Sequence, residues 1–186
     1  MREGYVFGLI KNHLSFLYAA VGAAFFVAPL GVHAMSSTSQ IDTVQRLDTQ
    51  PLMIRKGSGK QVFFTVEVAD DIGEQRTGLM YRTALDAGEG MIFLYDQPRV
   101  IGMWMKNTLI PLDMIFMDQA GRVVNVHAQA EPGSLTSIRS RGLSVAVLEI
   151  KGGDAQALGL QAGDQVFHCH FGNFPCETTP AEAVPD

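Results

Sequence analysis

The sequence lacks the features that mark several common protein classes. Two cysteines in 186 residues allow a disulfide only as a local staple, so a disulfide-rich scaffold is excluded. Only 18% of the residues are charged, the formal net charge is −5 and no basic run is present, which argues against a nucleic-acid partner. No G-x-S-x-G, H-E-x-x-H or Gly-rich phosphate motif occurs, and no internal repeat is visible. The length and the 47% hydrophobic content suit one domain with a real core.

A long uncharged hydrophobic run occurs near the N-terminus, at residues 14–30. Basic residues Arg2 and Lys11 precede it, and Val-His-Ala, with small residues at both key positions, follows and ends at Ala34. We therefore expect residues 1–34 to be a secretory signal peptide that is cleaved after Ala34, which makes the mature protein periplasmic. The alternative is an uncleaved helix that anchors the protein in the inner membrane, although this run is at the short limit for crossing a bilayer.

The two cysteines, Cys169 and Cys176, lie close together in "FHCHFGNFPC" near the C-terminus. In an oxidising compartment this spacing favours a disulfide that closes a small loop, and in a reducing one the cysteines would be free thiols. His168 and His170 suggest a soft-metal site, but on a strand both point away from the face of Cys169. We therefore expect the Cys169–Cys176 disulfide and no metal, with unpaired cysteines as the alternative.

Short apolar stretches with strand character recur every ten to fifteen residues after residue 50. In "QVFFTVEVAD" the apolar residues Val62, Phe64 and Val66 alternate with a second set that includes Thr65 and Glu67, as in a half-buried strand. About eight such strands, separated by turn signals, predict a mainly β fold. We expect a single antiparallel β-sandwich or small barrel with one or two short helices. No alternation of strands and helices of the βαβ type is visible.

Local signals place the helices, one turn and the domain boundaries. Asp70 or Asp71 would cap a short helix that has Glu74 in its first turns and that Gly78 weakens or ends. Gly121 would supply a positive φ in a hairpin loop. "GGDAQALGLQAGD" indicates one or two further helical turns. We expect a flexible leader at residues 35–50, a β domain at 51–172 and a loose tail at 173–186.

Charged residues interrupt the apolar stretch "MWMKNTLIPLDMIF", residues 103–116. Lys106 and Asp113 are about equidistant from the turn between them, so in a hairpin they would lie opposite or diagonal and form an ion pair. Burying either charge alone is costly, so they either pair or line a cleft that is open to water. In a cleft, Lys106 would bind an anion, Asn107 would bind a carbonyl or hydroxyl group, and Trp104 would stack on the ligand.

Another carboxylate is predicted to face the interior. Glu149 shares a strand face with Val145 and Val147, so it needs a basic partner or a ligand unless strand twist brings it to the sheet edge. The candidate partners are Arg76, Arg82 and Lys106.

Five motifs in order resemble the uncharacterised family catalogued as domain of unknown function 192. They are "RTGLMYR" (76–82), "GMIF" (90–93), "MWMKNTLIPLDMIFMD" (103–118), "LEIKGG" (148–153) and "GLQAGDQV" (159–166). The resemblance covers roughly residues 51–172; Met103 departs from it, since Phe is more usual there, and the cysteine pair looks peculiar to this branch. It implies a small all-β domain, often exported or lipid-tethered, with no established activity. The family's signature polar positions correspond to Arg76, Lys106, Asn107, Asp113 and Glu149.

Three functions are compatible with these residues. We favour a non-catalytic periplasmic domain that binds a small polar or anionic ligand without a cofactor, with membrane contact only through the N-terminal segment if that segment is uncleaved. The first alternative is a hydrolase-like enzyme with Asp113 or Glu149 as general acid or base and with Lys106 or Arg76 stabilising charge. The second is a structural accessory domain whose polar set is a buried ion network that specifies the fold. The expected ligand-binding set is Arg76, Trp104, Lys106, Asn107, Asp113 and Glu149.

Overall fold

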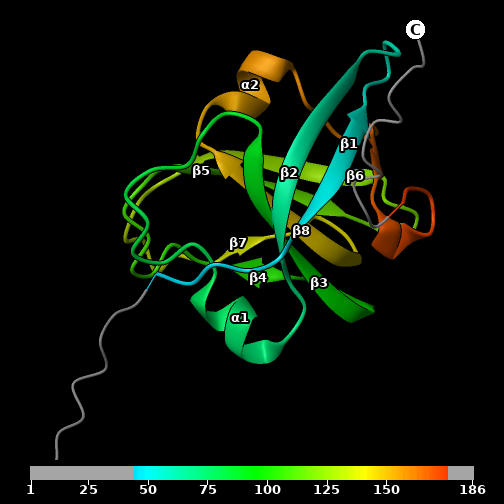
Figure 1. Ribbon diagram of the computed structural model, residues 1–186. Coiled ribbons are helices and arrows are strands. Elements are labelled where there is room, and N and C mark those ends of the chain that lie inside the picture. Colours follow the sequence, from blue (N-terminus) through cyan, green and yellow to red (C-terminus); the bar gives the residue numbers. More distant parts are fainter. Residues whose placement is uncertain (1–43, 176–186) are drawn as a thin grey trace, which may run out of the picture. The chain divides into compact units, whose positions relative to one another are not determined.

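The computed structural model describes residues 44–175, which form a mainly β domain (Figure 1). The predicted fold class is confirmed, with nine strands and two short α-helices in this part of the chain. The elements are β1 (Thr49–Arg55), β2 (Gln61–Ala69), α1 (Ile72–Thr77), β3 (Glu89–Arg99), β4 (Gly102–Met103), β5 (Leu112–Met117), β6 (Val123–Ala130), β7 (Ile138–Arg139), β8 (Ser144–Lys151), α2 (Asp154–Leu158), β9 (Gln165–Phe167) and the 3-10 turn η1 (Cys169–Phe171).

Seven strands form one sheet in the order β6-β5-β8-β3-β2-β1-β9, and β4 pairs with β7 in a separate small sheet. The pairs are antiparallel, as predicted, with one exception: β2 and β3 are parallel, with Thr65 opposite Glu89. A parallel pair requires a crossover, and the chain that contains α1 supplies it. The short helix was predicted, but the parallel pairing was not, because α1 has only six residues and does not resemble the long helix of a βαβ unit.

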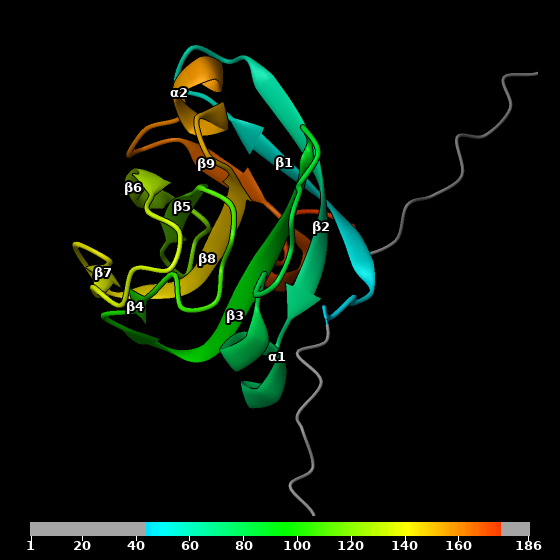
Figure 2. The ribbon, with the colours of Figure 1, turned by 90° about the vertical axis from the view of Figure 1, so that its left-hand side faces the viewer.

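The sheet curls until its two outer strands meet (Figure 2). Arg122, just before β6, forms a β-bridge with Gln165 of β9, and the Val166 amide donates to the Gly121 carbonyl at 2.8 Å. Gly121 has φ +75°, as predicted, and a Cβ there would lie 2.6 Å from the Val166 carbonyl oxygen. A glycine is therefore required at the place where the sheet closes on itself.

Apolar side chains cover both faces of the large sheet. One cluster includes Ile54, Val66 and Leu148, and the other includes Met91, Phe93, Met114 and Phe116. β8 is buried from Ser144 to Ile150 because it lies between β5 and β3 with both of its faces covered. Since successive side chains of a strand point to opposite faces, Leu148 joins the first cluster and Glu149 lies in the layer of the second.

The N-terminal part of the described chain contacts the domain. The side-chain amide of Gln45 donates to the carbonyl oxygens of Glu74 and Gly78, both at 3.0 Å, and the Leu47 amide donates to Glu67 Oε2 at 2.8 Å. Gln45 and Leu47 belong to the segment predicted as a leader. The predicted signal peptide and most of the predicted tail lie outside the described residues. None of the helices within residues 44–175 has the length and apolar character needed to cross a membrane.

Candidate functional site

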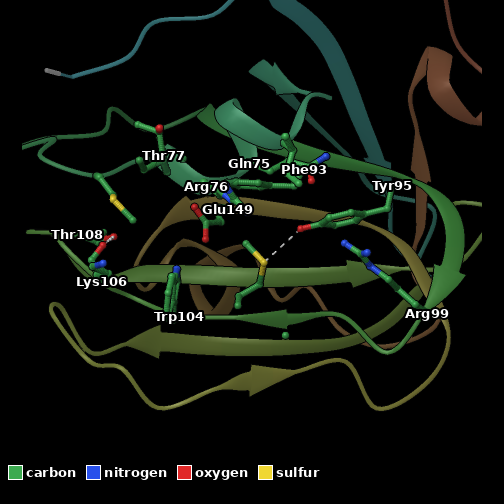
Figure 3. Close-up of a pocket in the computed structure, with 16 residues that line it drawn as sticks. Gln75, Arg76, Thr77, Phe93, Tyr95, Arg99, Trp104, Lys106, Thr108 and Glu149 are labelled. Carbon is green, nitrogen blue, oxygen red and sulfur yellow. Dashed lines mark hydrogen bonds between the residues drawn. The ribbon is translucent and has the colours of Figure 1, made fainter. Parts of the chain in front are cut away.

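A cleft of about 270 Å³ lies between α1, β3, β4 and the loop that follows β4 (Figure 3). Four of the predicted site residues line it, namely Arg76, Trp104, Lys106 and Glu149. Asn107 and Asp113 are not among the lining residues. The cleft also contains side chains that the sequence did not single out, among them Gln75, Phe93, Tyr95, Arg99 and Thr108, together with Met103.

Glu149 forms the floor of the cleft, and its carboxyl group points into the cavity (Figure 3). On the sheet it lies between Met91 of β3 and Met114 of β5, and only 4% of its surface is exposed. Within residues 44–175 its carboxyl group makes no hydrogen bond or ion pair, and burial raises the pKa of Glu149 to about 8. At neutral pH the group is therefore mostly protonated, with unused hydrogen-bonding capacity.

Three aromatic side chains form walls of the cleft. Phe93 is almost fully buried, whereas Trp104 is 50% exposed at the mouth. The Tyr95 hydroxyl donates to Met103 Sδ at 3.7 Å. Burial raises the pKa of Tyr95; Arg99 counteracts this, and the negative charge of Glu149 adds to it. Tyr95 therefore keeps its proton at physiological pH and remains a hydrogen-bond donor.

Three exposed cationic side chains, Arg76, Arg99 and Lys106, surround the mouth. The Arg99 guanidinium carbon lies 4.2 Å from the centre of the Tyr95 ring, and Lys106 Nζ lies 5.6 Å from the Trp104 ring centre. In the described part of the chain both ion pairs involve Glu67, so no carboxylate neutralises these cations at ion-pair distance. The cleft thus has a positive rim above a buried carboxyl group.

The position of Arg76 follows from the local sequence of α1. Asp71 Oδ1 accepts hydrogen bonds from the amides of Gly73 at 2.6 Å and Glu74 at 2.8 Å, and Glu74 Oε2 accepts from the Asp71 amide at 3.3 Å. Of the two predicted caps, Asp70 and Asp71, the structure thus has Asp71, in a capping box with Glu74. The helix ends at Gly78, with φ +49°, where a Cβ would lie 3.0 Å from the Phe93 ring. The glycine therefore lets the end of α1 pack closely on the cleft wall and directs Arg76 to the mouth.

Asn107 holds the loop that carries Lys106. Its side-chain amide donates to Tyr81 Oη at 2.7 Å, and its main-chain carbonyl oxygen accepts from the Tyr81 main-chain amide at 2.8 Å. Asn107 therefore contributes to the cleft indirectly, through the placement of its neighbour.

Asp113 is completely buried and has a different set of partners from the one predicted. Its Oδ1 accepts from the Gln129 amide at 2.7 Å, and its Oδ2 accepts from the amides of Gly153 at 2.9 Å and Ala155 at 2.7 Å. The predicted Lys106–Asp113 ion pair is therefore wrong. The hairpin that it required does not form, because β4 pairs with β7 while β5 lies between β6 and β8.

Arg82, one predicted partner of Glu149, instead pairs with Glu67. Arg82 is 2% exposed, and its Nη1 and Nη2 lie 2.7 and 2.6 Å from Glu67 Oε1 and Oε2. Burial alone would raise the pKa of Glu67, but the hydrogen bonds from Arg82 and the Leu47 amide, with the charges of Arg82 and Arg46, outweigh it and lower the pKa. The predicted ion network among the six site residues is therefore wrong, and the buried ion pair within residues 44–175 joins Glu67 and Arg82 instead.

The C-terminal histidines lie close to Cys169. His168 is fully buried, its Nδ1 accepts from the His170 amide at 3.3 Å, and Cys169 Sγ lies 3.1 Å from Gln50 Oε1. The predicted disulfide involves Cys176, which lies outside the described residues. Residues 44–175 contain no group of three or more His, Cys, Asp or Glu side chains that could hold a metal ion.

An irregularity in β3 explains why Tyr95 and Arg99 were missed. Leu94 lies opposite Ala146, but the next pair joins Arg99 to Ser144, so β3 carries extra residues at this point. Such a bulge bends the strand and redirects its side chains, which brings Arg99 back over Tyr95. Pro98 was the only local hint, because proline is tolerated in strands at edges and bulges.

Comparisons with known proteins identify a family and no activity. The model of the family DUF192, described as "Uncharacterized ACR", matches residues 53–168. A solved protein of unknown function from Novosphingobium aromaticivorans is 39% identical, with a TM-score of 0.63 over 80% of this chain and 99% of that one. A proposed transcription regulator from Sinorhizobium meliloti is 34% identical, with a TM-score of 0.65 over 67% of this chain and 97% of that one. No curated protein matches the chain.

Proposed function

Since the chain belongs to the uncharacterised family DUF192, whose description assigns no activity, we propose from the site itself that this domain binds a small polar or anionic ligand in the cleft. Arg76, Trp104, Lys106 and Glu149 would contact the ligand. The two other members of the predicted set, Asn107 and Asp113, would act indirectly by fixing the loop and the strand that support the site.

The observation that carries this proposal is the state of Glu149. A carboxyl group that is 4% exposed and has no hydrogen-bond partner in residues 44–175 is costly to retain. It lies at the floor of an open cleft, so a ligand can supply the missing hydrogen bonds. The volume of about 270 Å³ lies near the lower end for ligand pockets and suits a molecule of small-metabolite size.

We also propose that the protein is exported to the periplasm. This proposal is supported by the N-terminal sequence, in which a basic start, an uncharged apolar run and the Val-His-Ala tripeptide precede the domain. Fractionation of cells that produce a C-terminally tagged chain tests this: a periplasmic product that begins at Met35 is expected. A full-length product in the inner membrane would favour the anchor, and a cytoplasmic product would contradict export.

Binding can be measured at the site because the chain contains a single tryptophan, Trp104, at the mouth of the cleft. We expect at least one compound in a panel of small polar and anionic metabolites to raise the melting temperature and change the Trp104 emission. Lys106→Ala should weaken that response. Lys60→Ala, which removes an exposed lysine before β2, is the matched control. The proposal fails if no compound produces a response, or if both variants weaken it equally.

A hydrolase-like enzyme is a second candidate because Glu149, with a pKa of about 8, holds a proton at neutral pH in a cleft that Arg76 and Lys106 also line. Asp113 does not fit this role, since both of its oxygens accept hydrogen bonds from main-chain amides. Chromogenic esters, phosphoesters and glycosides test the idea. Turnover of one of these substrates that Glu149→Gln abolishes would support an enzyme. If the natural protein and Glu149→Gln both show only the uncatalysed rate, the enzyme is ruled out for these substrates.

A further inference from the structure

We propose that the ligand of this cleft is a zwitterion of the amino-acid type, with its ammonium group against Glu149 and its carboxylate toward Arg76, Arg99 and Lys106. This inference rests on the proposed function and goes beyond it by naming the ligand class and the orientation of the ligand.

Charge of the two signs is separated by depth in the cleft. Glu149 is 4% exposed at the floor, whereas Arg76, Arg99 and Lys106 are exposed at the mouth. Figure 3 shows the Glu149 carboxyl group in the middle of the cleft, with the three cationic side chains arranged around it. A ligand that matches this field carries its positive end inward and its negative end outward.

Two of the three cations at the mouth lie against aromatic rings of the cleft. The Arg99 guanidinium carbon is 4.2 Å from the Tyr95 ring centre, and Lys106 Nζ is 5.6 Å from the Trp104 ring centre. Burial raises the pKa of Glu149 to about 8, so the positive rim does not keep its carboxyl group ionised at neutral pH. The place next to the carboxyl group is therefore open to a cation from outside.

Ligands with a single charge fit less well. A simple anion would contact the three cations but would leave Glu149 as a neutral donor. A simple amine would reach Glu149 but would have to pass and then face the positive rim. A compact zwitterion neutralises both sets of charges within about 270 Å³.

The sign of the proton linkage separates these ligands. The charged or titratable side chains that face Glu149 in the cleft are Arg76 from α1, Tyr95 and Arg99 from β3, and Lys106 from the loop after β4; its strand neighbours Met91 and Met114 are uncharged. Because the empty site holds a proton on Glu149 below about pH 8, an ammonium group should expel that proton. Zwitterion affinity should therefore rise about tenfold per pH unit up to about pH 7 and more slowly as the pH approaches 8. A simple anion that accepts a hydrogen bond from protonated Glu149 should bind equally well from pH 6 to 7 and more weakly above pH 8.

The test is calorimetry on the mature protein with matched probes. Each of the twenty amino acids is titrated first. The tightest binder is then compared with its analogue that lacks the ammonium group and with its analogue that lacks the carboxylate. For phenylalanine these are 3-phenylpropionate and 2-phenylethylamine. We expect at least tenfold tighter binding of the amino acid than of either analogue, and the release of nearly one proton at pH 7, measured from the heats in two buffers of different ionisation enthalpy.

Variants assign the two ends of the ligand. Glu149→Gln should weaken the amino acid at least tenfold and abolish proton release, with little effect on the deaminated analogue. Its melting temperature shows whether it is folded. Arg76→Ala should weaken the amino acid and the deaminated analogue but not the amine, and Lys60→Ala should change none of them.

The outcomes distinguish this inference from the proposed function. If a deaminated analogue binds as tightly as its amino acid, or if proton uptake replaces release, the zwitterion is wrong. If no amino acid binds but other polar or anionic compounds do, the ligand class is wrong and the binding function stands. If nothing binds, both are wrong.

Discussion

Tyr81 and Asn107 lie in different loops and are joined by two hydrogen bonds, from the Tyr81 amide to the Asn107 carbonyl at 2.8 Å and from Asn107 Nδ2 to Tyr81 Oη at 2.7 Å. Both residues have positive φ, +63° for Tyr81 and +54° for Asn107, an uncommon conformation outside glycine. The contact joins the segment after α1 to the loop after β4. It therefore fixes the distance between the two sides of the cleft that present Arg76 and Lys106.

Two substitutions of Asn107 should separate the stability contributed by its side-chain hydrogen bond from the stability that depends on its positive φ. Asn107→Gly loses the side-chain bond but adopts positive φ easily, so it should cost about 1 kcal/mol of unfolding free energy. Asn107→Ala should cost a further 1 kcal/mol or so, because alanine is strained at that φ. Urea unfolding measures both values, and equal stability of the two variants would contradict the strain argument.

Lys106 and Asp113 should behave independently. Asp113→Asn puts an amide group where three main-chain amides need acceptors, so it should destabilise the domain by about 2–4 kcal/mol. Lys106→Met should change stability by less than about 0.5 kcal/mol, since Lys106 is exposed. Thermal or urea unfolding of both single variants and the double variant completes the cycle. A coupling energy well above 0.5 kcal/mol would show that Lys106 and Asp113 interact, which would contradict this expectation.

The raised pKa of the buried Glu149 should make the unfolding free energy depend on pH. Its pKa is about 8 in the folded protein against an ordinary value of 4.5, so the folded state binds the proton more tightly than the unfolded state. The contribution of Glu149 to stability is therefore most favourable below pH 4.5, falls by about 1.4 kcal/mol per pH unit between 4.5 and 8, and is constant above pH 8.

Comparison with Glu149→Gln isolates this effect, because all other titrating groups are common to both proteins. The variant should gain stability relative to the natural protein as pH rises from 5 to 8. Urea unfolding at a series of pH values measures the difference, and a difference that does not change with pH would show that Glu149 is ionised in the folded state.

The Glu67–Arg82 pair should be strongly cooperative. Arg82→Met leaves a buried carboxylate without its main partner and should cost about 3–5 kcal/mol at pH 7. Adding Glu67→Gln should recover part of that loss, because the isolated charge is removed. If the unpaired Glu67 carboxylate is not the cause of the loss, the double variant should be no more stable than Arg82→Met alone.

The same pair predicts a loss of stability in acid. The pKa of Glu67 is lowered by Arg82 against the effect of burial, so the pair stabilises the protein above pH 4.5 and loses this contribution as pH falls through the folded-state pKa. The difference in unfolding free energy between the natural protein and Arg82→Met should therefore shrink as the pH falls through the pKa values of Glu67 in the two folded proteins, and it should be smallest in strong acid. A difference that persists undiminished to pH 2 would contradict this assignment.

The features that the sequence determined by itself are those that depend on neighbouring residues. Alternation along β8 placed Glu149 on the inner face with Val147, because side chains in a strand have a period of two. The Asp71–Glu74 capping box and the turn at Gly121 were also local, since each needs only a few consecutive residues. The mainly β class followed from many such segments.

Only the tertiary structure decided which of these residues meet. Asp113 accepts hydrogen bonds from residues 129, 153 and 155. Arg82, in the crossover between the parallel strands β2 and β3, pairs with Glu67 of β2. A bulge in β3 brought Arg99 and Tyr95 to a cleft whose floor comes from β8. Pairings of this kind depend on strand order and on the closure of long loops. The local pattern of side chains carries almost no information about either. The sequence could therefore show that Glu149 is buried, but only the fold shows that it faces an open cleft with a positive rim.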